Sequence, residues 1–254
     1  MTLYFISIGL WDEKDMSLRA LEVARSCDFL FLELYTQPMN TTKEKLEKLI
    51  GKRISKLSRK DLEENYEQLL DLARTKRVGL LVGGDAFCAT THAMLRVEAT
   101  KRGVETRVIH GSSVFSAVAE CGLHMYKFGA TATLPLPERV CGLPYSVYEK
   151  VRMNKMNGLH TLLLLDIDVE NDKFLTPREA MKTLLEMERT KGCGVFKNDT
   201  RIIVLSRLGS ERTEIAYGKV KDLVKLEFKL PAVIVVPGDL HFTEEEYLNQ
   251  FLTI

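Results

Sequence analysis

The stretch Val78-Gly79-Leu80-Leu81-Val82-Gly83-Gly84-Asp85 decides the fold class of this chain. Its first five residues form a short, nearly unbroken apolar run, which is typical of a strand buried on both faces of a parallel sheet. Two glycines and an aspartate follow directly and lead into a longer loop that reaches His92. Ligands of open α/β sheets gather at the carboxyl ends of strands, so this loop is the first candidate for a binding site.

Similar strand signals lie on both sides of this stretch, at Leu3–Ile8, Phe29–Leu34 and Thr106–His110. Helical patterns separate them. The expected helices comprise one stripe over Leu18, Leu21 and Ala24, one opened by a capping box at Thr41 and ended by Gly51, one from Ser58 with Leu62, Tyr66, Leu69, Leu70 and Ala73 on one face, and one with Ala93, Met94 and Val97. Alternating strands and helices predict an open, mostly parallel α/β sheet.

The second half of the chain has a different pattern, because its strands follow one another with fewer helices. The expected strands are Thr131–Leu136, His160–Ile167, Arg201–Ser206, Glu214–Lys219 and Ala232–Val236. Capping patterns at Thr176-Pro177-Arg178-Glu179 and at Thr243 open two helices. Successive strands favour a mixed sheet. The sequence therefore predicts two α/β domains, residues 1–112 and 113–254.

Composition excludes several classes of protein. The 254 residues carry a formal net charge of +1, which argues against a nucleic-acid binder that relies on bulk electrostatics. The hydrophobic content of 45% argues against a disordered chain. The five cysteines include no C-x-x-C pair, which disfavours a zinc ribbon or a thioredoxin-like site. We expect a reducing compartment and no metal. With no signal core or membrane span in the pattern, we expect a cytoplasmic protein without membrane contact.

The loops after the strands point to a small-molecule site without naming the ligand. Paired glycines allow close approach of the backbone, and Asp85 can accept hydrogen bonds. Neither a G-x-x-x-x-G-K-[ST] nor a G-x-G-x-x-G motif occurs, which disfavours ATP, GTP and NAD. Structural interpretations remain open: a tight turn with an Asp helix cap for Gly83–Asp85, a packing role for His110 and a small buried side chain for Cys88.

Six ordered segments together carry a resemblance to a known family. They are Leu3–Glu13, Gly84–His92, His110–Ala117, Gly122–Gly129, Gly158–Ile167 and Val236–His241. The set resembles the diphthine synthase family of tetrapyrrole-methylase-like enzymes and covers nearly the whole chain. Tyr126-Lys127-Phe128-Gly129 and Leu159-His160-Thr161-Leu162 favour this family over its tetrapyrrole-modifying relatives.

The resemblance implies a fold, a reaction and a set of contacts. It implies two α/β domains with S-adenosyl-L-methionine in the cleft between them, and a homodimer. It also implies successive methylation of the amino group of a 3-carboxy-3-aminopropyl chain on a histidine of translation elongation factor 2. The positions that it implies for donor contact are Leu10, Asp85, Cys88, Ser113, Val114, Leu165, Leu208 and Ala232.

One position departs from the family pattern, and several questions stay open. The family usually reads Gly-Asp-Pro where this chain has Ala86, and we expect the restored N–H to loosen the loop. Asp85, His92 and His110 are candidates for the base that deprotonates the acceptor amine, and Tyr35 is a candidate to orient the acceptor. The alternatives are a related tetrapyrrole or RNA methyltransferase and a non-catalytic donor-binding protein.

Overall fold

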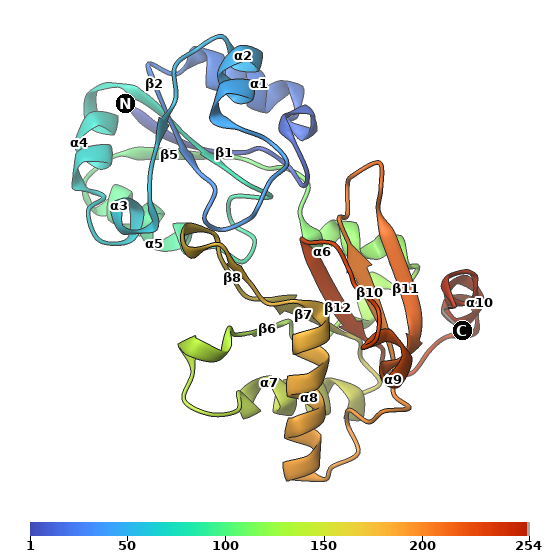
Figure 1. Ribbon diagram of the computed structural model, residues 1–254. Helices are drawn as coiled ribbons and strands as arrows, with labels where there is room; N and C mark the ends of the chain where they lie inside the picture. Colours follow the sequence, from blue (N-terminus) through green and yellow to red (C-terminus); the bar gives the residue numbers. More distant parts are fainter. Residues whose placement is uncertain (253–254) are drawn as a thin grey trace. The chain divides into compact units, whose positions relative to one another are not determined.

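A computed structural model describes residues 1–252 as two compact units. The first unit comprises Met1–Ala117 and the second begins at Val118. The domain boundary that we expected after residue 112 stays a prediction. Each unit is built around its own five-stranded sheet (Figure 1).

The sheet of the first unit is parallel throughout. Its strands lie in the order β3-β2-β4-β1-β5, and every neighbouring pair runs in the same direction. They are β1 (Thr2–Ser7), β2 (Phe29–Glu33), β3 (Ser55–Lys56), β4 (Arg77–Val82) and β5 (Glu105–Ile109). The central strands β1 and β4 are almost fully buried, as their continuous apolar pattern predicts.

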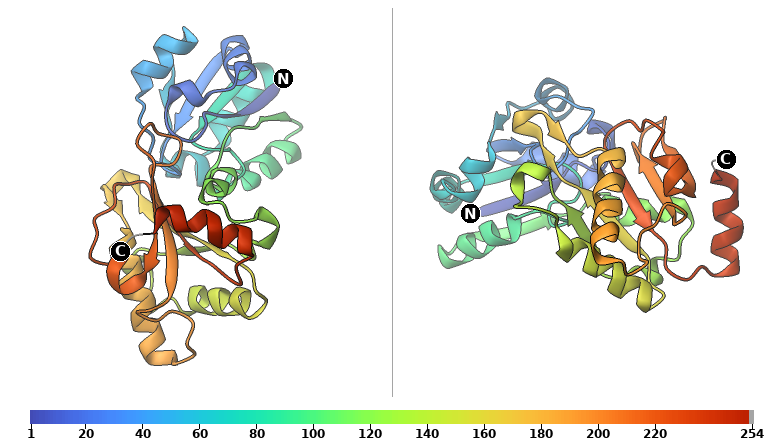
Figure 2. Two further views of the ribbon diagram at one scale, coloured as in Figure 1. Left: turned by 90° about the vertical axis from the view of Figure 1, so that its right-hand side faces the viewer. Right: turned by 60° about the horizontal axis from the view of Figure 1, so that its bottom comes forward.

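Helices cover both faces of this sheet (Figures 1 and 2). One hydrophobic cluster joins the sheet to α1 (Leu18–Ser26) and α2 (Lys43–Ile50), and another joins it to α3 (Arg59–Glu63), α4 (Glu67–Thr75) and α5 (His92–Lys101). Short turns η1 (Glu13–Asp15) and α6 (Val114–Ala117) follow β1 and β5. Doubly covered parallel sheets bury their strands on both faces, which is why these strands lack polar alternation.

Three details of the first unit differ from the sequence-based expectations. The helix expected from Ser58 to Ala73 is broken at Glu64–Tyr66 into α3 and α4. The helix that ends at Gly51 begins one residue later than expected: Thr42 is its N-cap, and Thr41 instead donates to Glu13. The expected helix is confirmed as α5, but Met94 and Val97, which suggested it, are exposed, and its buried residues are His92, Leu95 and Ala99.

The second unit has a mixed sheet in the order β11-β10-β12-β7-β6. Only β6 and β7 are parallel, and the other neighbouring pairs are antiparallel. The strands are β6 (Ala132–Leu134), β7 (Thr161–Leu165), β10 (Arg201–Ser206), β11 (Glu214–Lys219) and β12 (Ala232–Val236), with a separate pair β8 (Ile167–Asp168) and β9 (Lys173–Phe174). The predicted fold class, a mostly parallel sheet followed by a mixed one, is therefore confirmed.

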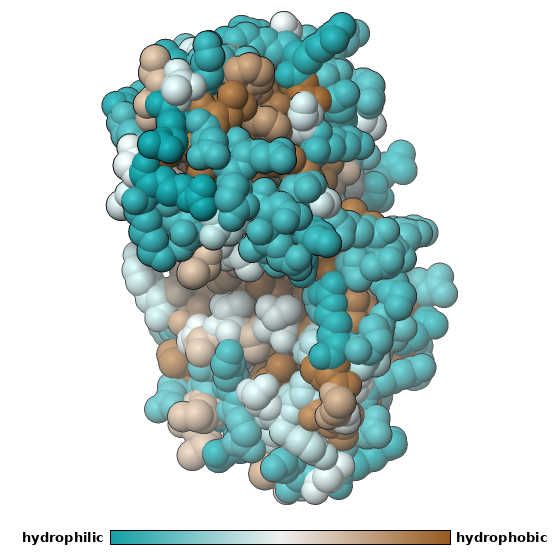
Figure 3. Space-filling view, turned by 90° about the vertical axis from the view of Figure 1, so that its left-hand side faces the viewer, coloured by the Kyte–Doolittle hydropathy of each residue, from teal (hydrophilic) through white to brown (hydrophobic). Residues whose placement is uncertain are grey.

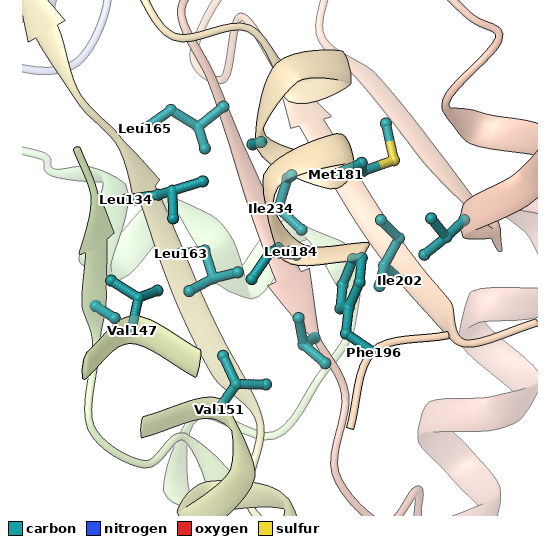
Figure 4. Packing of buried hydrophobic residues seen from close by; sticks show 14 of the residues in the cluster. Leu134, Val147, Val151, Leu163, Leu165, Met181, Leu184, Phe196, Ile202 and Ile234 are labelled. Carbon is teal, nitrogen blue, oxygen red and sulfur yellow. The ribbon is translucent and has the colours of Figure 1, made fainter. Parts of the chain in front are cut away.

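Two long helices of the second unit pack on one large core (Figure 4). The first is α7 (Tyr145–Met156), which contributes Val147 and Val151, and the second is α8 (Pro177–Lys191), which contributes Met181 and Leu184. The same cluster includes Leu163 and other strand residues. The capping box at Thr176 and Glu179 forms as predicted. The remaining elements are α9 (Val220–Leu223), α10 (Phe242–Leu248), η2 (Val118–Cys121), η3 (Met125–Lys127), η4 (Pro137–Arg139), η5 (Val169–Asn171) and η6 (Asn249–Phe251).

The start of the last helix differs from the expectation. Its N-cap is His241, whose side chain and Glu244 form a capping box, and Thr243 lies inside the first turn. Sequence spacing favours Thr243 because Thr is among the preferred N-cap residues. After α10, Leu252 bridges to Tyr217 of the edge strand β11.

The surface matches the balanced composition. On the face drawn in Figure 3, hydrophilic residues predominate and hydrophobic areas interrupt them. Among residues 1–252, no helix combines the length and the apolar character needed to cross a membrane.

Candidate functional site

Three loops meet at the carboxyl end of the first sheet. They follow β1, β4 and β5, which are neighbours in the sheet. Gly9 and Gly84 exchange two backbone hydrogen bonds, of 3.1 and 2.7 Å, and so tie the first two loops together. Both glycines have positive φ, +103° and +68°, which only glycine adopts without strain. The backbone of this edge is therefore fixed by residue choice.

Asp85 joins the loop after β4 to the loop after β5. Its carboxylate accepts from the Phe87 N–H at 3.0 Å and from the Gly111 N–H at 3.1 Å, and it accepts from Nδ1 of His110 at 2.9 Å. Burial alone would raise the pKa of Asp85, but these hydrogen bonds outweigh it and hold the pKa below its ordinary value. Asp85 is thus a carboxylate that positions two loops, and it is a poor candidate for a base.

His110 is the open end of this network. Its side chain is 74% exposed, whereas that of Asp85 is 6% exposed. Because an ionised carboxylate only accepts, the Nδ1 of His110 carries the proton in this contact, and Nε2 is then the acceptor nitrogen of the neutral ring. The packing role that we left open for His110 is excluded by its exposure. An imidazole oriented by a carboxylate is the usual arrangement of a general base.

Leu10 is held by a contact that the sequence did not reveal. Its side chain is 8% exposed, and its carbonyl oxygen accepts from Nε2 of Gln37 at 2.6 Å. The side-chain oxygen of Gln37 lies 2.4 Å from the place where a Cβ on Gly84 would be. Gln37 therefore braces the loop after β1 and the Gly84 turn. Nothing in the local sequence pattern marks it, since it lies in an irregular segment after β2.

Cys88, Ser113 and Val114 lie in the same two loops. The Oγ of Ser113 accepts from the Phe115 N–H at 3.3 Å, so Ser113 caps the short α6. Val114 is the first residue of α6 and is half-buried. Burial raises the pKa of Cys88, whose thiol contacts Ser113, so Cys88 remains a neutral thiol near pH 7.

The other expected contact residues lie at the ends of three neighbouring strands, on the same side of the second sheet. Leu165 ends β7, Leu208 follows the end of β10, and Ala232 begins β12. Ser206 pairs with Ala232, and Val233 pairs with Leu164, so the antiparallel register brings these positions to the same edge. The structure thus places five expected residues in loops at the carboxyl ends of strands in the first unit. It places the other three at the ends of neighbouring strands in the second unit. Their roles in binding stay predictions.

Two other candidates are buried away from the loops' surface. His92 is 1% exposed, and its Nε2 lies 3.0 Å from Oε1 of Glu33, which is fully buried. Glu33 also accepts from the hydroxyl and the N–H of Thr36. Tyr35 is 5% exposed and belongs to the hydrophobic cluster under α3, α4 and α5. Burial argues against contact of His92 or Tyr35 with an acceptor at the surface of the loops, and their roles stay predictions.

We expected Ala86 to loosen its loop, but the structure shows that the loop is held by hydrogen bonds at this residue. The Ala86 N–H, which a proline would lack, donates to the Oγ of Ser7 at 3.0 Å. Its carbonyl accepts from the Thr90 hydroxyl at 2.6 Å. Because both backbone groups of Ala86 are bonded and its side chain is fully buried, the loop is anchored by a different means.

The two family-favouring segments of the second unit build a buried anchor around Glu244. Oε1 of Glu244 lies 3.0 Å from Nε2 of His160, and Oε2 lies 2.5 Å from Nζ of Lys127. The N–H groups of His124 and His241 also donate to this carboxylate, at 2.7 and 2.8 Å. This Glu244 anchor fixes α10 to β7, whereas Tyr126 of the same segment is 99% exposed.

Within residues 1–252 we find no group of three or more His, Cys, Asp or Glu side chains able to hold a metal ion. The expectation of a metal-free enzyme stays a prediction.

Known proteins match this chain over nearly its whole length. Residues 2–224 match the family described as Tetrapyrrole (Corrin/Porphyrin) Methylases. The chain belongs to the diphthine synthase family. It is 42% identical over 251 residues to the diphthine synthase of Methanocaldococcus jannaschii, with 97% of each chain covered. A diphthine synthase from Methanosarcina mazei is 43% identical over 254 residues, with 97% of this chain and 94% of the relative covered.

A solved structure agrees with these relatives. A crystal structure of diphthine synthase superimposes with a TM-score of 0.90 at 35% sequence identity and covers 99% of this chain and 96% of the other. The protein is accordingly a methyltransferase of the tetrapyrrole methylase fold. For a member of this family, the loops around Asp85 and the edge at Leu165 become candidate sites for a methyl donor.

Proposed function

We propose that this protein transfers methyl groups from S-adenosyl-L-methionine to the amino group of a 3-carboxy-3-aminopropyl chain on a histidine of elongation factor 2. The product is diphthine, the trimethylated intermediate of diphthamide biosynthesis. Membership of the diphthine synthase family supports the reaction class. The Asp85 network, with His110 open at its end, is the observation that supports a site at the first sheet.

The proposed chemistry is an in-line displacement at a sulfonium methyl group. The amine nitrogen forms a bond to the methyl carbon as the bond from that carbon to sulfur breaks, and the electron pair stays on sulfur. The donor is already activated, so holding the two reactants in line supplies much of the rate. The loops at Gly9, Gly84 and Gly111 are suited to that task because hydrogen bonds tie them to one another.

The acceptor amine must lose a proton before it can attack. We assign this step to Nε2 of His110, because Asp85 holds the proton on Nδ1 and the ring is exposed. The amine proton passes to Nε2, and Asp85 stabilises the imidazolium that forms. We place the donor against the apolar and backbone groups of Leu10, Cys88, Ser113 and Val114, which lie in the same loops. Leu165, Leu208 and Ala232 are the further proposed contacts.

The test is methyl transfer to the precursor form of elongation factor 2. Isotopically labelled donor is incubated with the enzyme and with elongation factor 2 that carries the aminocarboxypropyl group, and mass spectrometry counts the added methyl groups. We expect transfer to this precursor and none to elongation factor 2 with an unmodified histidine.

Two other outcomes would contradict the proposal. Transfer to a corrinoid precursor or to RNA, with none to the elongation factor, would assign a related methyltransferase. Donor binding by calorimetry without transfer to any acceptor would assign a non-catalytic binding protein.

The setting of the reaction is part of the same proposal. We infer a homodimer in the cytoplasm, acting on elongation factor 2 without a membrane, nucleic acid or metal. The near-zero net charge directs the search for docking contacts to local basic groups near Lys52–Lys60 and Arg139–Lys155. Arg139 forms ion pairs with Asp166 and Asp168, which lowers the positive charge available near Arg139–Lys155. Sedimentation equilibrium would measure the oligomeric state.

A further inference from the structure

Ser7 is a buried polar residue at the carboxyl end of an apolar strand. It ends β1 and is 1% exposed. Its Oγ accepts the Ala86 N–H at 3.0 Å across 79 residues of sequence, and both groups lie out of water. A buried N–H without a partner costs free energy, so this hydrogen bond constrains the start of the Asp85 loop.

The same side chain supports the loop after β5. A Cβ built on Gly111 would lie 2.7 Å from the Cβ of Ser7, so the two backbones approach as closely as a glycine allows. Gly111 in turn donates to Asp85. Ser7 therefore lies beneath both loops that Asp85 joins, and it contacts each of them.

We propose that Ser7 is the positioning residue of the methyl-donor site, and that its hydrogen bond to Ala86 performs the task for which the Gly-Asp-Pro pattern uses a proline ring. A proline restrains the loop by fixing φ and has no N–H to satisfy. Alanine leaves φ free and exposes a donor, and the Ser7 hydroxyl both satisfies this donor and fixes the peptide. The inference rests on the proposed binding of S-adenosyl-L-methionine by these loops.

The pairing predicts opposite effects of one substitution in two backgrounds. Ser7→Ala leaves the Ala86 N–H buried without a partner and should weaken donor binding roughly tenfold. Ala86→Pro in the presence of Ser7 removes the donor and places a ring carbon against the hydroxyl, so it should also weaken binding. The double variant Ser7→Ala/Ala86→Pro has neither an orphaned N–H nor the crowded hydroxyl, and it should bind within about twofold of the unmodified protein.

The experiment measures the donor Kd by calorimetry for the full chain and the three variants, with thermal unfolding of each. Thr2→Val is the matched control, because it removes a hydroxyl that donates to Glu105 at the opposite end of the same strand. The control should leave the donor Kd unchanged. Kinetics give a second readout: Ser7→Ala should raise KM for the donor more than it lowers kcat, since Ser7 does not touch the reacting atoms.

Two results would overturn the inference: a donor Kd unchanged by Ser7→Ala, or a folded double variant that binds no better than Ser7→Ala. If the variants do not fold, hydrogen exchange of the Ala86 amide in the unmodified protein decides. Slow exchange supports the bond, and exchange as fast as that of an exposed loop amide refutes it. If the unmodified protein binds no donor, the proposed function fails, and the Ser7–Ala86 bond is then judged by rescue of thermal stability and by exchange alone.

Discussion

The Asp85 network in the first unit and the Glu244 anchor in the second use the same parts for different ends. In each, one carboxylate collects two backbone N–H groups and an imidazole nitrogen. His160 is fully buried and receives the Gly238 N–H on Nδ1, so both of its nitrogens are occupied. His110 is 74% exposed and uses only Nδ1 in the network. The Glu244 anchor, in which both nitrogens of His160 are bonded, holds α10 in place. The Asp85 network leaves Nε2 of His110 accessible to a reactant.

The largest effect is expected from Asp85→Ala. It releases two loops and the orientation of His110, and misplacement of a reacting group by about 1 Å can cost roughly hundredfold in rate. Initial rates of labelled methyl transfer should fall by about that factor. Asp199→Asn, which alters an exposed ion pair with Lys221, is the control and should retain the rate. If the Asp85→Ala rate stayed within threefold of the unmodified rate, Asp85 would have only a structural role, as Glu244 does.

Glu244→Gln should act on stability and much less on the rate. Burial would raise the pKa of Glu244, but hydrogen bonds from the His241 N–H, Lys127, the His124 N–H and His160 lower it to about 2. A lowered carboxylate pKa stabilises the folded protein above the unfolded-state value near 4.5 and loses that contribution as the pH falls toward about 2. The variant should be less stable by ~3 kcal/mol at pH 7, with a smaller loss on acidification.

Urea unfolding between pH 7 and pH 3 measures this effect. Glu245→Gln, at the exposed neighbouring position, is the matched control and should follow the unmodified protein. The anchor would not be the source of acid sensitivity if the Glu244→Gln and Glu245→Gln curves coincided.

His110→Asn should lower kcat about tenfold and leave the unfolding midpoint unchanged. The loss is modest because water can also accept the amine proton, and the stability is retained because the ring is exposed. The opposite pattern, lost stability with an unchanged kcat, would place His110 in the same structural class as His160.

The smallest effect is expected from Tyr126→Ser. Although Tyr126 adjoins Lys127 of the anchor, it is 99% exposed, so the free energy of unfolding should change by about 0.5 kcal/mol or less. Lys127→Met would remove a charge partner of the buried Glu244 and should cost several times more. Equal effects on the urea midpoint would show that the segment acts as a unit.

Sequence patterns located most of the elements of this fold. The strands β10, β11 and β12 have the predicted bounds, because short apolar runs between turn residues leave few alternatives. The buried face of α5 does not follow from the sequence, because His92 is buried by its contact with Glu33, a partner 59 residues away that no helical periodicity reveals. The N-cap of α10 was missed for a similar reason, since Glu244 bonds to His241, His124 and His160 together.

For the candidate site too, some features follow from the sequence and others only from the tertiary structure. Sequence alone determined which loops follow the strands, which glycines permit close approach and to which family the ordered segments correspond, because these are local properties of residue order. Only the tertiary structure decided that Asp85 joins two loops, that His110 is exposed and that Ser7 satisfies the Ala86 N–H. Those facts depend on strand register, which brings together residues 25 to 79 positions apart. Burial and hydrogen bonding at such distances set the chemistry, and a local pattern does not contain them.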